Sequence, residues 1–360
     1  MRDLEIRAHD FDLRMTLNSG QVFHWEKVGA GFCGAIGDCV AYVEQRGNSL
    51  RAKVEDGVLR SRRRNKGPAR MAGSPTAATA AQLVQNYFAL DHPLEEICES
   101  FPPDALMNSA RAFCSGLRII RQPKWECLAT FICSSMKQVA HIRQISRALR
   151  QRFGEKKQIR EHDVFSFPSV GRLARTSETE LLQCGLGYRA KNLLATARRI
   201  DSGEADLNSW STLSDGELRE RLCQLPGVGI KIANCAMLFA YERIAAFPID
   251  VWIERVLRQE YFARRRKVTG QMMAKFAADH FGRYGGYAQQ YLFHHARKAS
   301  RNSGAPRDFS TPLRSGRNDK RRDARTASRK SGEPRDASHH RHGYGGAGES
   351  ARNDKKGMLE

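Results

Sequence analysis

Long apolar runs, paired cysteines and acidic residues are all scarce in this 360-residue sequence, and each shortage argues against a class of protein. No apolar run is long enough to cross a bilayer as a helix, and the first residues lack the apolar core of a signal peptide. The nine cysteines are an odd number, have no Cys-x-x-Cys spacing, and end at Cys235. They argue against a disulfide framework and a zinc site. We therefore expect an intracellular protein, in the cytoplasm or nucleoid of a bacterium or the nucleus of a eukaryote.

Acidic residues are too few to balance the basic ones. The chain has 60 Lys and Arg against 39 Asp and Glu, a formal net charge of +21. This excess favours a polyanionic partner, nucleic acid first and an anionic membrane surface second. Residues 299–360 are basic and almost free of apolar side chains, so we expect a disordered tail there. From residue 301 the tail has 15 basic against 8 acidic residues, a surplus of 7, so most of the positive charge belongs to the folded part.

Residues 1–104 are predicted to form a small antiparallel sheet domain. Apolar and polar residues alternate there over short runs, and residues 39–44 and 49–54 each have the pattern of a strand. Residues 60–80 combine several arginines with Gly, Pro, Ser, Thr and Ala, a composition typical of a flexible insertion. A helix from Ala81 is then expected to close the domain.

A mostly helical domain is predicted over residues 105–298, with two capped helix–turn–helix units. In the first unit, Ser177 and Glu180 have the spacing of a capping box, and a Gly-Leu-Gly turn precedes Tyr188 and Arg189. An aromatic ring beside a cation at a helix start suits base stacking and phosphate contact. Packing of the tyrosine and solvation of the arginine would explain the same residues without a ligand.

The second unit has the stronger signal. Ser214 and Glu217 form another capping-box pair, Pro226 and Gly227 end the first helix, and Gly229 is expected to allow the tight turn. The next helix follows at once. Its first amides have no partner within the helix and lie at the positive end of the helix dipole, which suits a phosphate.

Lys231, Cys235 and Asp250 are the chemically suggestive residues after this turn. Lys231 lies in the first turn of the second helix, and Cys235 stands one turn later on the same face. Asp250 follows a Phe-Pro-Ile turn. A lysine in such a place is commonly a solvated charge, and the aspartate is expected to cap the helix that starts at Val251. Capping leaves the second carboxylate oxygen available for chemistry.

This constellation resembles the helix-hairpin-helix DNA glycosylase superfamily. Further patches extend the resemblance to the 8-oxoguanine DNA glycosylase/AP lyase branch, over about residues 10–298. In chain order they are Ser19 to Trp25, Phe131 to Ser135, Gly185 to Ala190, the hairpin with Lys231 and Asp250, and Ala288 to Phe293. The resemblance implies an α+β fold, in which an N-terminal antiparallel sheet domain of the TBP-like type packs on a mostly α-helical helix-hairpin-helix domain.

The resemblance also implies a role for each matching residue. Lys231 would be the nucleophile and Asp250 its essential carboxylate. The residues expected to bind the damaged base are Gly20, Cys235, Pro248, Gln289 and Phe293. The residues expected to contact DNA are Tyr188, Arg189, His141, Gly227 and Gly229.

The implied activity is excision of 8-oxoguanine from double-stranded DNA, followed by strand nicking through a Schiff base. The enzyme is expected to act as a monomer, without a membrane, a catalytic metal or a redox cofactor. Some branches of the superfamily hold an iron–sulfur cluster with four cysteines after the catalytic aspartate, and here no cysteine follows Cys235. The hairpin of the family can hold a monovalent cation through backbone carbonyls.

Two departures from the familiar pattern affect specificity. Met136, Lys137, Gln138 and His141 stand where well-known relatives have an Asn-rich run and an arginine that help to read the opposite cytosine. Trp252 replaces a histidine near the phosphate. Two alternatives to the implied activity also stay open: a glycosylase of the same fold for an alkylated purine or an oxidised pyrimidine, and a catalytically silent DNA-binding module.

Overall fold

The computed structural model describes residues 4–55, 77–134 and 138–302. The expected tail from residue 303 onward, most of the expected insertion, and two of the departing residues, Met136 and Lys137, lie outside these ranges. The helix expected from Ala81 begins earlier, at Ala77. The helix start was therefore wrong by four residues, because the Ala-rich run that looked like linker composition also has high helix propensity, and the insertion itself stays a prediction.

Five antiparallel strands form the N-terminal sheet, in the spatial order β1–β5–β4–β3–β2. They are β1 (Leu4–Arg7), β2 (Glu26–Val28), β3 (Gly31–Ile36), β4 (Cys39–Arg46) and β5 (Ser49–Glu55). The two strands expected from alternation, at 39–44 and 49–54, are confirmed as β4 and β5. One face of the sheet packs against α1 (Leu13–Asn18) and α3 (Ala77–Tyr87), through a buried core that includes Val43, Leu50 and Phe88.

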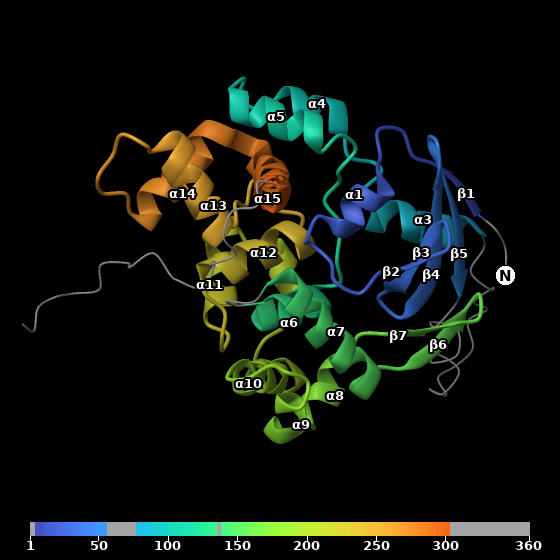
Figure 1. The fold of residues 1–360 in the computed structure, drawn as a ribbon. Helices are drawn as coiled ribbons and strands as arrows, with labels where there is room; N and C mark the ends of the chain where they lie inside the picture. Colours follow the sequence, from blue (N-terminus) through green and yellow to red (C-terminus); the bar gives the residue numbers. More distant parts are fainter. Residues whose placement is uncertain (1–3, 56–76, 135–137, 303–360) are drawn as a thin grey trace, which may run out of the picture. The chain divides into compact units, whose positions relative to one another are not determined.

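A short hairpin covers part of the other face, and no sequence pattern predicted it. Its strands are β6 (Lys156–Ile159) and β7 (His162–Phe165), and its two turn residues, Arg160 and Glu161, have φ of 48° and 68°. Turns of this kind usually carry Asn or Gly, so the usual hairpin signal was absent. The hairpin is a separate two-stranded sheet that lies beside the larger one (Figure 1). It packs on β4, because Ile159 is buried with Val40 and Tyr42.

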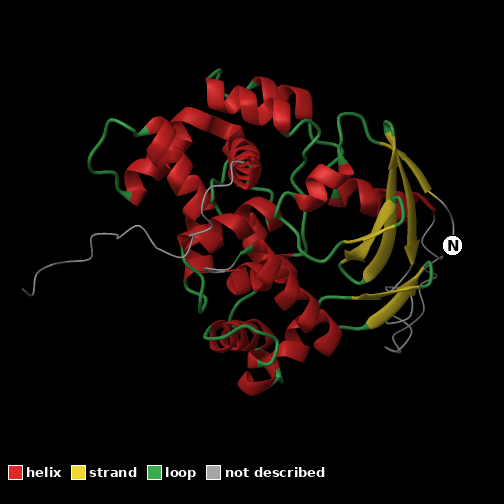
Figure 2. Cartoon of the chain, in the orientation of Figure 1, coloured by secondary structure: helices red, strands yellow, loops and turns green. Residues whose placement is uncertain are grey.

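Most of the remaining described chain is helical, and these helices lie to one side of the five-stranded sheet, whereas α1 and α3 lie beside it (Figure 2). The helices before the hairpin are α4 (Leu94–Glu99), α5 (Ala105–Phe113), α6 (Lys124–Ser134) and α7 (Val139–Phe153). After it come α8 (Val170–Ala174), α9 (Glu178–Leu182), α10 (Arg189–Asp201), η1 (Ser209–Thr212), α11 (Asp215–Cys223), α12 (Ile230–Ala240), α13 (Val251–Val256), η2 (Leu257–Tyr261), α14 (Gly270–Phe281), η3 (Gly282–Tyr284) and α15 (Gly285–Asn302). The α+β prediction is therefore confirmed.

Both parts belong to one compact unit, and the boundary expected at residue 104 stays a prediction. The capping boxes at Ser177 and Ser214 are confirmed. The helix after Asp250 does not run to about Arg264 as expected, because a π-helical turn interrupts it and ends at Tyr261. Within the described residues no helix has the length and apolar character needed to cross a membrane.

Gln21 joins the sheet domain to the start of the helical part. The side chain is fully buried, and its Nε2 donates to the carbonyls of Thr16, at 3.2 Å, and Arg118, at 2.8 Å. Its Oε1 accepts from the Ile120 amide at 2.7 Å. The amide group thus fixes the loop that holds Gly20 against a segment almost a hundred residues later.

We expect Gln21→Leu to lower the free energy of unfolding by about 3–5 kcal/mol, since it leaves several buried backbone groups without partners. Urea denaturation would measure the loss. Gln144→Leu on the exposed face of α7 is the matched control and should change stability little. A loss no larger than that of the control would show that the Gln21 bonds contribute nothing net.

Candidate active site

The hairpin between α11 and α12 is stabilised from α10. The Thr196 hydroxyl donates to the Pro226 carbonyl at 2.9 Å. Gly227 has φ of +79°, and a Cβ there would lie 2.7 Å from Cβ of Asn192. Gly229 instead has φ of −99° and ψ of 178°, with open space around its Cα. The tight turn was therefore assigned to the wrong glycine, because only the position of Gly227 excludes a side chain.

Lys231 lies partly buried in the first turn of α12 and does not point into bulk water. Its Nζ donates to Ser134 Oγ at 3.3 Å and lies 5.3 Å from the ring centroid of Phe131. Ser134 is the last residue of α6 and is buried, and its own hydroxyl donates to the Phe131 carbonyl at 2.7 Å. The amine is thus held at the negative end of the α6 dipole. Ser134 belongs to one of the patches of resemblance, but nothing in its spacing predicted this contact.

Asp250 caps α13, as expected. Its Oδ1 accepts from the amides of Trp252, at 3.0 Å, and Ile253, at 2.9 Å. Among the described residues no hydrogen bond is made to Oδ2. Burial raises the pKa of the carboxyl above its ordinary value, while the charge of Lys231, the two amides and the charge of Arg297 lower it. The carboxylate is therefore partly desolvated and interacts electrostatically with the charge of Lys231.

Cys235 lies near Lys231 and Asp250, and Pro248 precedes Asp250 in the chain. Cys235 is buried one turn after Lys231, and burial raises the pKa of its thiol to about 11. The Lys231 charge lowers that pKa and Asp250 raises it, so all three groups are near one another. Pro248 is buried two residues before Asp250. The structure therefore brings together Lys231, Cys235 and Asp250, three of the residues that the sequence selected.

One face of α15 supplies the other base-binding candidates. Gln289 is 4% exposed, and its Oε1 has no hydrogen-bond partner within the described residues. Phe293 lies one turn later and packs partly buried against the core. A Cβ added to Gly20, whose φ is +94°, would lie 3.0 Å from Cε1 of Phe293 and 2.6 Å from Nη1 of Arg297. Gly20 and Phe293 thus meet across the two parts of the molecule, with Arg297 beside them.

The expected DNA-contacting side chains differ in exposure. Tyr188 precedes α10 and is 62% exposed, whereas Arg189 is 5% exposed. The Arg189 guanidinium lies 4.3 Å from the Tyr188 ring centroid and donates to the Leu186 carbonyl at 3.1 Å. His141 is exposed in the first turn of α7, and Gln138 is exposed just before that helix. Their contacts with DNA stay predictions, and Arg189 would have to turn outward to reach a base.

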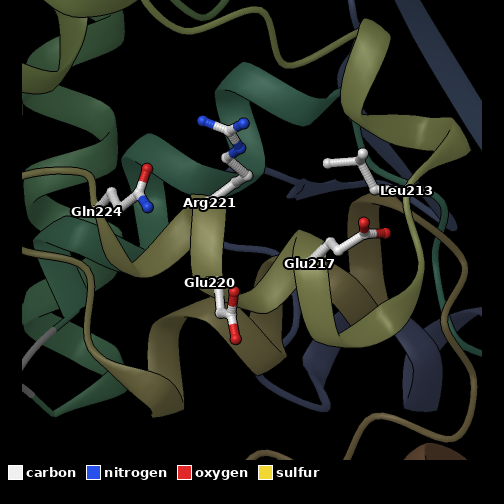
Figure 3. Close-up of a pocket in the computed structure, with 5 residues that line it drawn as sticks. All are labelled: Leu213, Glu217, Glu220, Arg221 and Gln224. Atoms are coloured by element: carbon white, nitrogen blue, oxygen red, sulfur yellow. The ribbon is translucent and has the colours of Figure 1, made fainter.

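A surface pocket of about 310 Å³ lies elsewhere, on α11 (Figure 3). Its lining residues are Leu213, Glu217, Glu220, Arg221 and Gln224. Glu217 is already engaged there in the capping box with Ser214. None of the selected site residues lines this pocket, so it is not the candidate active site.

Two family models match consecutive parts of the chain. Residues 3–128 match the N-terminal domain of 8-oxoguanine DNA glycosylase, and residues 129–278 match the HhH-GPD superfamily of base excision DNA repair proteins.

Individual relatives agree with these models. The chain is 29% identical to the N-glycosylase/DNA lyase OGG1 of Arabidopsis thaliana, over 81% of this chain and 78% of that protein. It is 27% identical to a probable N-glycosylase/DNA lyase of Methanothermobacter thermautotrophicus, over 82% of this chain and 96% of that protein. Its structure resembles that of the Clostridium acetobutylicum 8-oxoguanine glycosylase/lyase, in complex with double-stranded DNA containing cytosine opposite 8-oxoguanine. The TM-score is 0.70 at 27% identity, over 83% of this chain and 99% of that one. The chain therefore belongs to the 8-oxoguanine DNA glycosylase/AP lyase branch of the HhH-GPD superfamily.

Proposed function

We propose that this protein is a bifunctional DNA glycosylase and AP lyase that removes 8-oxoguanine from double-stranded DNA, acting as an intracellular monomer. One observation supports this most directly. The amine of Lys231 and the carboxylate of Asp250 lie in one partly desolvated site, and Asp250 Oδ2 accepts no hydrogen bond from the described residues. A catalytically silent module would have no need of such a pair.

The reaction begins with extrusion of the damaged nucleotide, because its glycosidic carbon is buried inside the base stack. The exposed hairpin, where Ile230 is 68% exposed, presents helix-start amides to a phosphate during this step. The basic surface adds affinity that is independent of sequence.

Lys231 Nζ then forms a bond to C1′ while the bond from C1′ to the base breaks, and the base leaves with a proton. Asp250 stabilises the positive charge that develops on the sugar. Opening of the sugar ring gives a Schiff base between Nζ and C1′. Loss of a proton from C2′ then expels the 3′ phosphate and nicks the strand.

The pocket side chains suit an oxidised purine. The Gly20 carbonyl would accept a hydrogen bond from the N7 proton that 8-oxoguanine has and guanine lacks. The unpaired Oε1 of Gln289 can accept from the Watson–Crick edge, and Phe293 and Cys235 would enclose the ring. These roles follow the resemblance and are supported by the meeting of Gly20 and Phe293.

We propose that no iron–sulfur cluster, catalytic metal or redox cofactor takes part. The lysine and aspartate supply the nucleophile and the charge stabilisation that both steps need. A monovalent cation bound by hairpin carbonyls would serve DNA binding, not the chemistry.

A lesion panel tests the function. Duplexes with 8-oxoguanine, an alkylated purine, an oxidised pyrimidine or guanine are incubated with the protein, each with all four bases opposite, and base release and nicking are measured. We expect selective excision of 8-oxoguanine with nicking. Preference for another lesion would favour the same-fold alternative, and binding without release would favour the silent module. The four opposite bases also show whether Gln138 and His141 still favour cytosine.

Gly227 of the hairpin gives a further prediction with its own control. Gly227→Ala forces a side chain against Asn192 at a positive φ, so the turn must shift. We expect duplex affinity to fall about tenfold, for damaged and undamaged DNA alike, as measured by fluorescence anisotropy. The control is Gly216→Ala in α11, which should bind almost as the wild type does, because a Cβ there meets nothing within 4 Å. Equal losses in both variants would contradict this account of the turn.

A further inference from the structure

Arg297 is a buried cation that the proposed mechanism does not use. It lies on α15 one turn beyond Phe293 and two turns beyond Gln289, so the three residues share one face of the helix. The side chain is only 6% exposed. A long charged side chain is rarely buried to this extent unless other groups hold it in place.

The contacts of Arg297 lead into the Gly20 loop. Nη2 donates to the Asn18 carbonyl at 2.6 Å and lies 3.3 Å from Nδ1 of His294. The guanidinium carbon lies 5.2 Å from the ring centroid of Phe293, within the range of a cation–π interaction. Nη1 is so close to Gly20 that a Cβ there would lie 2.6 Å away. One planar group therefore touches the loop, the glycine and the ring together.

The loop that holds Gly20 is also fixed by hydrogen bonds to residues other than Arg297. Gln290 Nε2 donates to the Ser19 carbonyl at 3.2 Å, and Gln21 is fully bonded within the core. Arg143 of α7 donates to Asn18 Oδ1 at 3.0 Å. Arg297 is thus the member of this network that reaches both Gly20 and Phe293.

We propose that Arg297 is a positioning residue of the lesion pocket, which fixes the Gly20 carbonyl and the Phe293 ring at the spacing that an 8-oxopurine ring requires. This inference rests on the proposed function and deepens it. The charge of Arg297 also lowers the pKa of Asp250, but it is the weakest of the named influences on that carboxyl. The main effect of Arg297 is therefore expected on base recognition and not on the lysine chemistry.

The test separates the two steps of the reaction. The full-length Arg297→Gln variant is assayed under single-turnover conditions on duplexes containing 8-oxoguanine, and on duplexes containing a preformed abasic site, which has no base to hold. We expect excision of 8-oxoguanine to fall about 10- to 100-fold, as for a displacement of about 1 Å in a binding wall. Nicking of the abasic site should stay within about threefold of the wild type, because it depends on Lys231 and Asp250 alone.

Two further variants complete the design. Arg297→Lys keeps the charge but loses the planar fork, so excision should recover only in part. Lys275→Gln removes one charge from an exposed residue of α14 whose hydrogen bond goes to Asp279, and it should leave both steps unchanged.

Equal loss of both steps in Arg297→Gln, or an unchanged excision rate, would overturn the inference. If Arg297→Gln does not fold, the same comparison is made with Arg297→Lys. The ratio of its 8-oxoguanine excision rate to its abasic-site nicking rate then tests the inference. Absence of 8-oxoguanine excision by the wild type would instead reject the proposed function.

Discussion

Lys231→Gln is expected to abolish the covalent complex that borohydride traps between the wild-type protein and DNA containing 8-oxoguanine. The imine forms only through the Lys231 amine, and glutamine has no nucleophilic nitrogen. Excision should fall by at least about 10⁴-fold, as when other enzymes lose a nucleophile. Trapping on a denaturing gel and single-turnover base release would measure the two losses.

The fold of this variant should persist, because Lys231 is only partly buried and glutamine has good helix propensity. The matched control is Lys191→Gln. Lys191 is an exposed lysine in the first turn of α10, so its loss also removes one positive charge from a helix start. The control variant is expected to form the covalent complex with DNA, even where its duplex affinity falls. A wild-type trap in Lys231→Gln would reject Lys231 as the nucleophile.

Asp250→Asn should separate catalysis from folding. Asparagine is as good an N-cap as aspartate, so the bonds to the Trp252 and Ile253 amides should survive. The negative charge that stabilises the developing sugar cation is lost, and we expect excision to slow about 10²- to 10³-fold with duplex affinity almost unchanged. Single-turnover kinetics and anisotropy on the same duplex would test this pair of outcomes.

The raised pKa of Asp250 also predicts how Asp250→Asn changes the free energy of unfolding at each pH. Because the folded-state pKa exceeds the ordinary value of 3.8, the folded protein binds this proton more tightly than the unfolded chain does. The stabilisation is complete below pH 3.8 and is lost as pH rises through the raised value. Near neutral pH the Asn variant should therefore be at least as stable as the wild type, and the difference should shrink toward acid pH. Thermal melts across pH would show it.

The same raised pKa predicts the acid limb of the wild-type reaction. Excision needs ionised Asp250, so its rate should fall at a pH above that of an ordinary aspartate. Asp104→Asn is the control, since Asp104 also caps a helix, α5, but lies outside the site. This variant should keep the acid limb of the wild type. Activity loss in Asp250→Asn that matches a loss of stability would assign Asp250 a capping role only.

Much of the candidate site was predictable because it depends on short-range features. Both capping boxes join residues three positions apart, so their spacing alone predicts the helix starts. The Asp250 cap is equally local. The four-residue spacing of Gln289 and Phe293 predicts that they share one helix face, but their roles and that of Gly20 came from the resemblance. The structure adds that Gly20 and Phe293 lie against each other.

Local patterns and composition suffice for the helix starts and caps, for the two central strands of the sheet and for the basic charge, because each depends on neighbouring residues or on residue counts. The other features depend on tertiary packing. The β6–β7 hairpin has no turn signal and is held by packing on β4. Lys231 meets Ser134 across 97 positions, and Arg297 meets Asn18 across 279. Contacts over such distances depend on how buried faces pack, and no local spacing records that packing.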